Sequence, residues 1–201
     1  MSEFSPDNLI TMINSNILSF SIAVAVIVPF AIILVGYGIH MLCMLLAHIT
    51  DIFVSSRFIY VTINYLFFPG VVLHELSHAL FAVLTGAKVT KMVLFKKDGD
   101  TLGHVEFRHR GNSLLVAIQR IFISSAPMFL GALVVWGCHH VIFQVQTCPF
   151  WLKFLLGYLG VSMLFHMTMS KQDVKVYLKG VPVFSCLLFV VTFILKLFAR
   201  S

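Results

Sequence analysis

The stretch FPGVVLHELSHALF, residues 68–81, places two histidines and a glutamate among apolar side chains. His74 and His78 are four residues apart, so on a helix they project from one face, one turn from each other. This geometry lets two imidazoles bind one zinc ion, and Glu75 is placed to activate a zinc-bound water as general base. The stretch therefore predicts a zinc site with His74 and His78 as metal ligands and Glu75 as the catalytic residue.

The composition of the chain places this stretch in a membrane. Of the 201 residues, 59% are hydrophobic and only 11% are charged, whereas a soluble domain carries about 25% charged residues. The mean hydropathy is +0.97. A glutamate in the hydrocarbon layer is costly, and ionisable groups at that depth are candidates for function. We interpret residues 1–201 as one membrane-embedded domain and the motif as functional.

Five apolar runs approach or exceed the roughly 20 residues that a membrane-spanning helix needs. They cover about residues 17–47, 58–86, 113–138, 150–170 and 181–198. We expect an all-α polytopic membrane protein with about five transmembrane helices. Six is the alternative, because the first run is long and contains Pro29. The first 16 residues contain no Lys or Arg, so we expect the first run to remain as an anchor rather than to be a cleaved signal peptide.

The segment between the second and third runs changes its period. Two stretches with strand character flank KKDGD, and Asp98-Gly99 is a strong signal for a tight turn. We expect a β-hairpin over about residues 88–110, lying at the membrane face. It either caps the site or pairs with an unwound substrate segment as an added strand.

Basic residues predict the orientation of the chain in the membrane. With five spans, one side carries nine of them: Lys88, Lys91, Lys96, Lys97, Arg108, Arg110, Lys171, Lys175 and Lys179. The other side carries four: Arg57, Lys153, Lys196 and Arg200. The hairpin and the N-terminus are therefore expected in the cytoplasm, with a plasma or inner membrane as the favoured location. The net charge of +6 indicates an anionic leaflet rather than nucleic acid as the partner.

A catalytic zinc site needs a third protein ligand and an open position. Asp173 is preferred, because it follows the fourth run on the same side as the hairpin. Glu75 lies about 16 Å inside that face at roughly 1.5 Å per residue. The end of the fourth helix must therefore dip or unwind into the membrane for Asp173 to reach the zinc. The other candidates for the third ligand are His166, Asp51 and Glu106.

The sequence leaves two questions open: the state of the cysteines and the identity of an oxyanion donor. Cys138 and Cys148 flank one short loop and would pair in an oxidising compartment, but four free thiols are the preferred interpretation. An oxyanion donor is also required. The candidates for it are Ser124, Ser125 and His104.

The chain resembles the site-2 protease family of intramembrane zinc metalloproteases. The resemblance covers about residues 68–182 and is carried by HELSHAL, TGAKV, LGHVEF, SSAPMFLGAL and SKQDVKVYLKG. It implies that His74, His78 and Asp173 bind one zinc ion and that Glu75 activates water. The implied substrates are membrane-spanning or membrane-associated proteins, whose scissile segment must unwind before hydrolysis. The sequence does not predict an oligomeric state.

Three rival functions remain at this point. A membrane cytochrome would use histidines on two spans, and His40, His48 and His166 are available as haem ligands. A zinc or proton transporter would carry further ionisable groups along its path. A catalytically inactive protein of the same fold would keep the motif and bind without cleaving.

Overall fold

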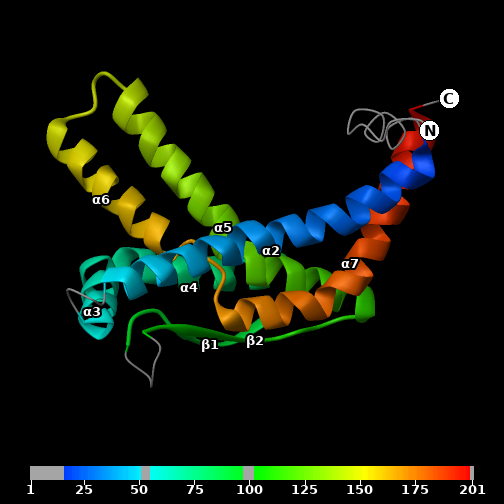
Figure 1. The fold of residues 1–201 in the computed structure, drawn as a ribbon, viewed down its shortest axis with the longest axis horizontal. Coiled ribbons are helices and arrows are strands. Elements are labelled where there is room, and N and C mark those ends of the chain that lie inside the picture. Colours follow the sequence, from blue (N-terminus) through cyan, green and yellow to red (C-terminus); the bar gives the residue numbers. More distant parts are fainter. Residues whose placement is uncertain (1–15, 51–54, 97–101, 200–201) are drawn as a thin grey trace.

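The computed structural model describes residues 16–50, 55–96 and 102–199, and nearly all of the regular structure is helical. Figure 1 shows the arrangement of the elements along the chain. In chain order they are α2 (Ile17–Thr50), α3 (Ser56–Leu66), α4 (Phe68–Leu84), β1 (Lys88–Val93), β2 (His104–Arg108), α5 (Ser113–Gln144), α6 (Phe150–His166) and α7 (Lys171–Phe198). The prediction of a mostly helical chain with a small two-stranded sheet is confirmed.

In the described part of the chain, three helices are long and apolar enough to cross a membrane. These stretches are Ile17–Leu42 of α2, Ser113–Gln144 of α5 and Lys171–Phe198 of α7. The apolar helices α4 and α6 have 17 residues each, somewhat fewer than a full crossing requires. Large apolar side chains such as Leu34, Trp136 and Phe154 are mostly exposed, as expected of surfaces that face lipid. The protein is therefore a membrane protein.

The apolar run expected at 58–86 is divided at Phe67 into two helices. Pro69 lies in the first turn of α4, where proline is tolerated, and its missing N–H cannot continue the hydrogen bonds of α3 across Phe67. The open backbone groups at this break bind α6: Tyr158 donates to Leu66 O at 2.6 Å, and Ser162 donates to Phe67 O at 2.8 Å. The Gly70 N–H donates to Ser162 Oγ at 2.7 Å. These contacts attach the start of α4 to α6.

The runs expected at 150–170 and 181–198 also have different limits in the structure. Helix α6 ends at His166, and α7 begins at Lys171, ten residues earlier than the last apolar run. Ser170 caps α7, since its hydroxyl accepts the Asp173 N–H while the Asp173 carboxylate accepts the Ser170 N–H. Asp173 therefore lies in the first turn of the last helix, and the chain between α6 and α7 is short and irregular.

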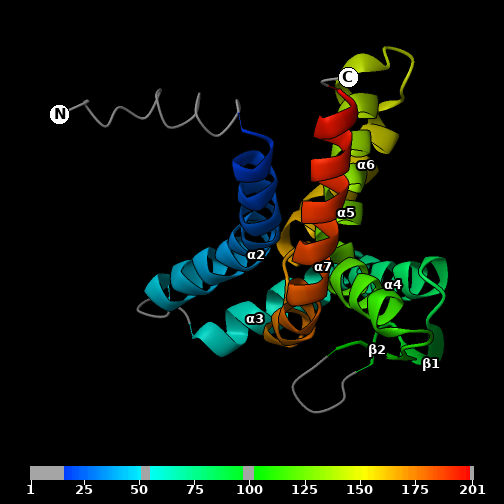
Figure 2. The ribbon, with the colours of Figure 1, turned by 90° about the vertical axis from the view of Figure 1, so that its right-hand side faces the viewer.

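Helix α5 is central and packs against α4, α6 and α7, while α2 packs along α7. Figure 2, turned by 90° from Figure 1, shows α5 and α7 next to each other with α2 on the other side of α7. Two hydrogen bonds link α2 with residues near Asp173. Tyr177 of α7 donates to Pro29 O at 3.1 Å, and the Met169 N–H donates to Gly36 O at 3.1 Å.

The hairpin pairs β1 with β2 in antiparallel register, from Lys88 opposite Arg108 to Val93 opposite His104, with an irregularity near Thr90. Its apolar side, Val89 and Phe107, packs on a cluster formed by Ala82, Ala87 and Ile123. The tight turn expected at Asp98-Gly99 lies outside the described residues.

One buried glutamine fastens the end of the hairpin to the helices. Gln119 of α5 donates to Thr85 O and Arg110 O, both at 3.0 Å, and accepts the Arg110 N–H at 3.1 Å. His109 also contacts the Gln119 carbonyl oxygen, at 3.2 Å. Burial lowers the pKa of His109, although the hydrogen bond with Gln119 acts in the opposite direction. Gln119 thus connects the C-terminus of α4, the hairpin and α5.

Three cysteines have described side chains, and all three are free thiols: Cys138, Cys148 and Cys186. The pairing of Cys138 with Cys148, the less favoured alternative, does not occur in the structure. Cys138 is buried beside Gly160 of α6, where it acts as a small apolar residue.

Candidate metal centre

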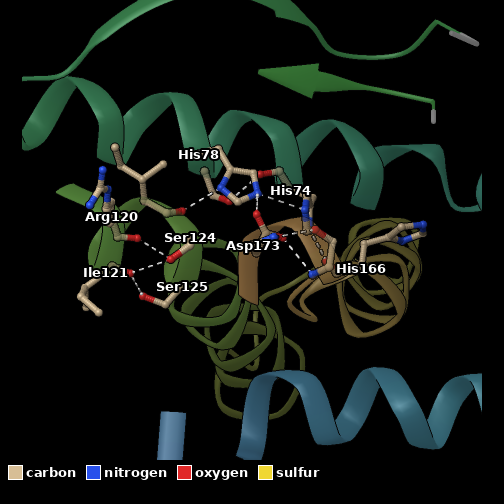
Figure 3. A network of polar contacts seen from close by, with 11 residues as sticks. His74, His78, Arg120, Ile121, Ser124, Ser125, His166 and Asp173 are labelled. Atoms are coloured by element: carbon tan, nitrogen blue, oxygen red, sulfur yellow. Dashed lines mark hydrogen bonds and ion pairs between the residues drawn. The ribbon is translucent and has the colours of Figure 1, made fainter. Parts of the chain in front are cut away.

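Helix α4 presents two imidazoles from one face, as the four-residue spacing predicts. The two Nε2 atoms of His74 and His78 lie 3.2 Å apart, and the rings are nearly perpendicular at 77°. His78 is buried, and His74 is half-buried. Both rings point away from α4 toward the region where α5 and α7 meet it (Figure 3).

Asp173 approaches this pair from the first turn of α7. Its Oδ1 lies 3.5 Å from His78 Nε2, while its Oδ2 accepts the Ser170 N–H at 2.8 Å. The capping box therefore holds one carboxylate oxygen and leaves the other directed at the histidines (Figure 3). One ligand atom from each of His74, His78 and Asp173 lies within 4.8 Å of the others. These three residues form a metal-binding arrangement.

Backbone carbonyls determine the tautomer of both histidines. His74 Nδ1 lies 2.6 Å from His166 O, and His78 Nδ1 lies 2.7 Å from Ile123 O. A carbonyl oxygen only accepts, so each Nδ1 must carry the proton. In the neutral form of each ring, Nε2 then carries the lone pair, which is the form that a metal-ligating imidazole requires.

The arrangement fits a small divalent cation. Two imidazole lone pairs and a carboxylate oxygen repel one another when they converge, and a cation among them removes that repulsion. With zinc–ligand distances of about 2.0–2.1 Å, neighbouring ligands of a tetrahedral site lie about 3.3 Å apart. Two of the three separations, at 3.2 and 3.5 Å, lie near this value, and all three ligand atoms lie within 4.8 Å of one another. Among the described residues, three side chains offer a ligand atom to such a cation.

A cavity of about 370 Å³ adjoins the three residues. Glu75 lines it together with Ser124, Gln172 and residues 103–105 and 107 of the hairpin segment. Gly103 packs directly on the glutamate, because a Cβ at this position would lie 2.8 Å from Glu75 Cγ. The cavity is large enough for water-sized molecules beside the Glu75 carboxylate and the three ligand side chains.

The other candidates for the third ligand lie differently. His166 Nδ1 is 2.8 Å from Ser162 O, and its Nε2 is 3.3 Å from the side-chain amide of Asn64. Both ring nitrogens therefore have partners, and His166 reaches the site only through its carbonyl. Glu106 lies on the exposed side of the hairpin, 3.5 Å from Lys91 Nζ. Asp51 lies outside the described residues.

The candidate oxyanion donors are also separated by the structure. Ser125 is fully buried and donates to Ile121 O at 2.6 Å. Ser124 lines the cavity, with its hydroxyl donating to Arg120 O and, at 3.3 Å, to Ile121 O. His104 also belongs to the cavity wall, but its Nε2 lies 3.7 Å from Glu106, toward the outer face of the sheet.

The histidines proposed for haem do not converge on one another among the described side chains. His40 of α2 stacks on Tyr37 with ring centroids 5.7 Å apart, and His166 is engaged as described above. His48, in the last turn of α2, is exposed.

Two structural contributors to the site were missed in the sequence. The first is Ser170, although Ser-Lys-Gln-Asp at 170–173 has the spacing of a helix-capping box. The second is the carbonyl of Ile123, for which Pro127 four residues later is the only available signal.

Comparisons with protein-family models, with curated proteins and with solved structures find no match to this chain. The functional argument therefore rests on the geometry of the site.

Proposed function

We propose that the protein is an intramembrane zinc metalloprotease similar to the site-2 proteases, which hydrolyses peptide bonds of membrane-spanning or membrane-associated substrates. One observation carries the proposal. The converging ligand atoms of His74, His78 and Asp173 adjoin a cavity that Glu75 also lines, between helices of mainly apolar composition. Ionisable side chains inside a membrane are costly in free energy, and those that a membrane protein contains are candidates for function.

The roles of the residues follow from their positions. His74, His78 and Asp173 would hold zinc. When bound, zinc polarises a carbonyl and lowers the pKa of water toward about 7. Glu75 takes the proton of the attacking water and delivers it to the leaving nitrogen. Ser170 and the carbonyls of His166 and Ile123 keep the three ligand side chains in place.

Water and substrate must both reach a site of this kind. Residues 167–170 lie between α6 and α7, and irregular backbone at membrane depth is stable where it lines a cavity. The segment that includes β2 forms one wall of the cavity. An extended substrate segment beside it would gain backbone hydrogen bonds as an added strand. We propose this pairing as the way in which the unwound substrate is held near Glu75.

The proposed orientation follows from charge. We propose five crossings with the hairpin and the N-terminus in the cytoplasm, because the basic residues gather on the hairpin and at the start of α7. The helices α4 and α6, too short for a straight full crossing, would complete their crossings with the residues that flank them.

The decisive experiment compares the wild type with Glu75→Gln. Both proteins are purified, zinc is quantified, and cleavage of a panel of single-span membrane proteins in liposomes is followed by mass spectrometry. We expect about one zinc per chain in both proteins and a fall in cleavage of about 10²–10⁴-fold in Glu75→Gln, the usual contribution of a general base.

The matched control is Glu106→Gln, on the exposed side of the hairpin, which should cleave like the wild type. Equal cleavage by Glu75→Gln would exclude Glu75 as the base. Zinc binding by a wild type that cleaves nothing would instead favour a binding protein with this fold.

A further inference from the structure

Pro127 lies inside α5 and is fully buried. Helix α5 changes direction in its middle (Figure 1), as expected of a helix with an internal proline. Proline has no N–H, so the carbonyl four residues earlier has no partner within the helix. In α5 that carbonyl belongs to Ile123.

The Ile123 carbonyl accepts a hydrogen bond from His78 Nδ1 at 2.7 Å. Ile123 is fully buried, and only 7% of His78 is exposed. The same oxygen atom therefore lacks a hydrogen bond within its own helix and orients a candidate metal ligand.

His74 is also held by a backbone carbonyl at the end of a helix. In a continuous helix, His166 O would accept the N–H of residue 170. In the structure the Ser170 N–H donates to Asp173 Oδ2 instead, and His166 O accepts from His74 Nδ1. Each histidine thus binds a carbonyl that an interrupted helix has left without a partner.

We propose that Pro127 is a positioning residue for the metal site. By withholding an N–H from the Ile123 carbonyl, it keeps that oxygen free to hold the Nδ1–H form of His78, which leaves Nε2 as a metal ligand. The inference rests on the metal-binding part of the proposed function and is independent of whether the protein hydrolyses peptides.

The test compares Pro127→Ala with the replacement of Pro127 by lactic acid, introduced through nonsense suppression. Both replacements remove the proline ring and add the same methyl side chain, but only alanine brings back an N–H. That N–H draws the Ile123 carbonyl toward the helix axis and away from His78. Outer partners of this kind change metal affinity by about 10–100-fold.

Zinc affinity is measured on the purified proteins by competition with a chromogenic chelator. We expect Pro127→Ala to bind zinc about 10–100-fold more weakly than the wild type, and the lactic acid variant to bind within about threefold of the wild type. Pro182→Ala in α7 is the control for a helix proline away from the ligands, and it should leave the affinity unchanged.

The outcomes are separable. Equal affinities of the alanine and lactic acid variants would overturn the inference while leaving the zinc site in place. If Pro127→Ala does not fold, Pro127→Gly, which also brings back the N–H, takes its place in the comparison, and a tenfold loss of affinity in the lactic acid variant overturns the inference. A wild type that binds no zinc would overturn the proposed function and this inference with it.

Discussion

Helix α4 and the part of α7 after Pro182 are both apolar and of similar length, but their polar residues serve different ends. In α4, the rings of His74 and His78 bind carbonyls from α6 and α5, and Glu75 lines a cavity. In the last part of α7, Thr192 donates to Leu188 O of its own helix, and the Lys196 Nζ lies 4.2 Å from the Phe20 ring centre.

The last part of α7 also exposes more apolar side chains than α4 does. Residues 190, 191, 194, 195, 197 and 198 of α7 are each more than 40% exposed, which suits contact with lipid. Helix α4 instead buries one face from Gly70 to Ala82. Hydropathy alone does not distinguish the two helices. Side-chain hydrogen bonds to other helices do distinguish them, because each such bond requires a partner helix.

The largest expected effect is a loss of zinc from the site that distinguishes α4 from the last part of α7. Asp173→Ala removes the carboxylate from the site, and we expect the zinc content of the purified protein to fall from about one per chain to near zero, since two imidazoles alone bind zinc weakly. Cys186→Ser, an exposed thiol on α7, is the control for metal bound elsewhere. Full zinc retention in Asp173→Ala would show that another residue is the third ligand.

A smaller effect is expected where the hairpin packs on α4. In Gly103→Ala the new methyl group would lie 2.8 Å from Glu75 Cγ and 2.9 Å from Leu94 O, so Glu75 must move. Displacement of a catalytic group by about 1 Å costs up to 100-fold in rate. We expect cleavage to fall about 10–100-fold while zinc content is unchanged.

Gly137→Ala in α5 is the matched control for this prediction, because nothing lies within 4 Å of its Cβ position. Undiminished cleavage by Gly103→Ala would show that the hairpin tolerates a shift at this point and does not position Glu75.

The third prediction concerns the packing of α4 on α6. In Gly70→Ala the methyl group would overlap Ser162 O and lie 2.5 Å from His166 Nδ1, so the two helices must separate. We expect a loss of about 1–3 kcal/mol in the free energy of unfolding, typical of overpacking, measured by chemical denaturation in detergent. Gly157→Ala in α6, with an open Cβ position, should not destabilise the protein. Equal stabilities would contradict the close crossing.

The smallest effect is expected in the lipid-facing region. Thr192→Val in α7 keeps the shape of the side chain and removes only a hydrogen bond within the helix, so we expect a change within about 0.5 kcal/mol. Ser77→Ala in α4 removes a similar local bond, to His74 O at 2.6 Å, but at a fully buried position. We expect about 1 kcal/mol there, and the same denaturation assay compares the two. A larger loss in Thr192→Val would mean that the Thr192 side chain itself packs against protein rather than lipid.

Much of the arrangement follows from local patterns. The hydrophobic runs predict the helices, and the change of period between residues 88 and 110 predicts the hairpin, since side chains repeat every 3.6 residues in helices and every two in strands. The convergence of His74 with His78 is local as well, because it needs only one turn of one helix.

Other parts of the site were outside the reach of the sequence. Asp173 was expected to reach the histidines by an unwound end of the fourth helix, whereas it lies in the first turn of α7. Gln119 stands within an apolar run and gave no signal, yet it connects three elements. Its partners are backbone groups, which every residue carries, so no sequence pattern marks them.

The sequence by itself determined the class of the protein and the pair of imidazoles, because composition and helical spacing act over a few residues. Only the tertiary structure decided which carboxylate faces that pair and which carbonyls orient the rings. Those choices depend on where helices are interrupted and how they cross. Such crossings are set by packing between segments that lie up to about a hundred residues apart in the chain, as with His74 and His166.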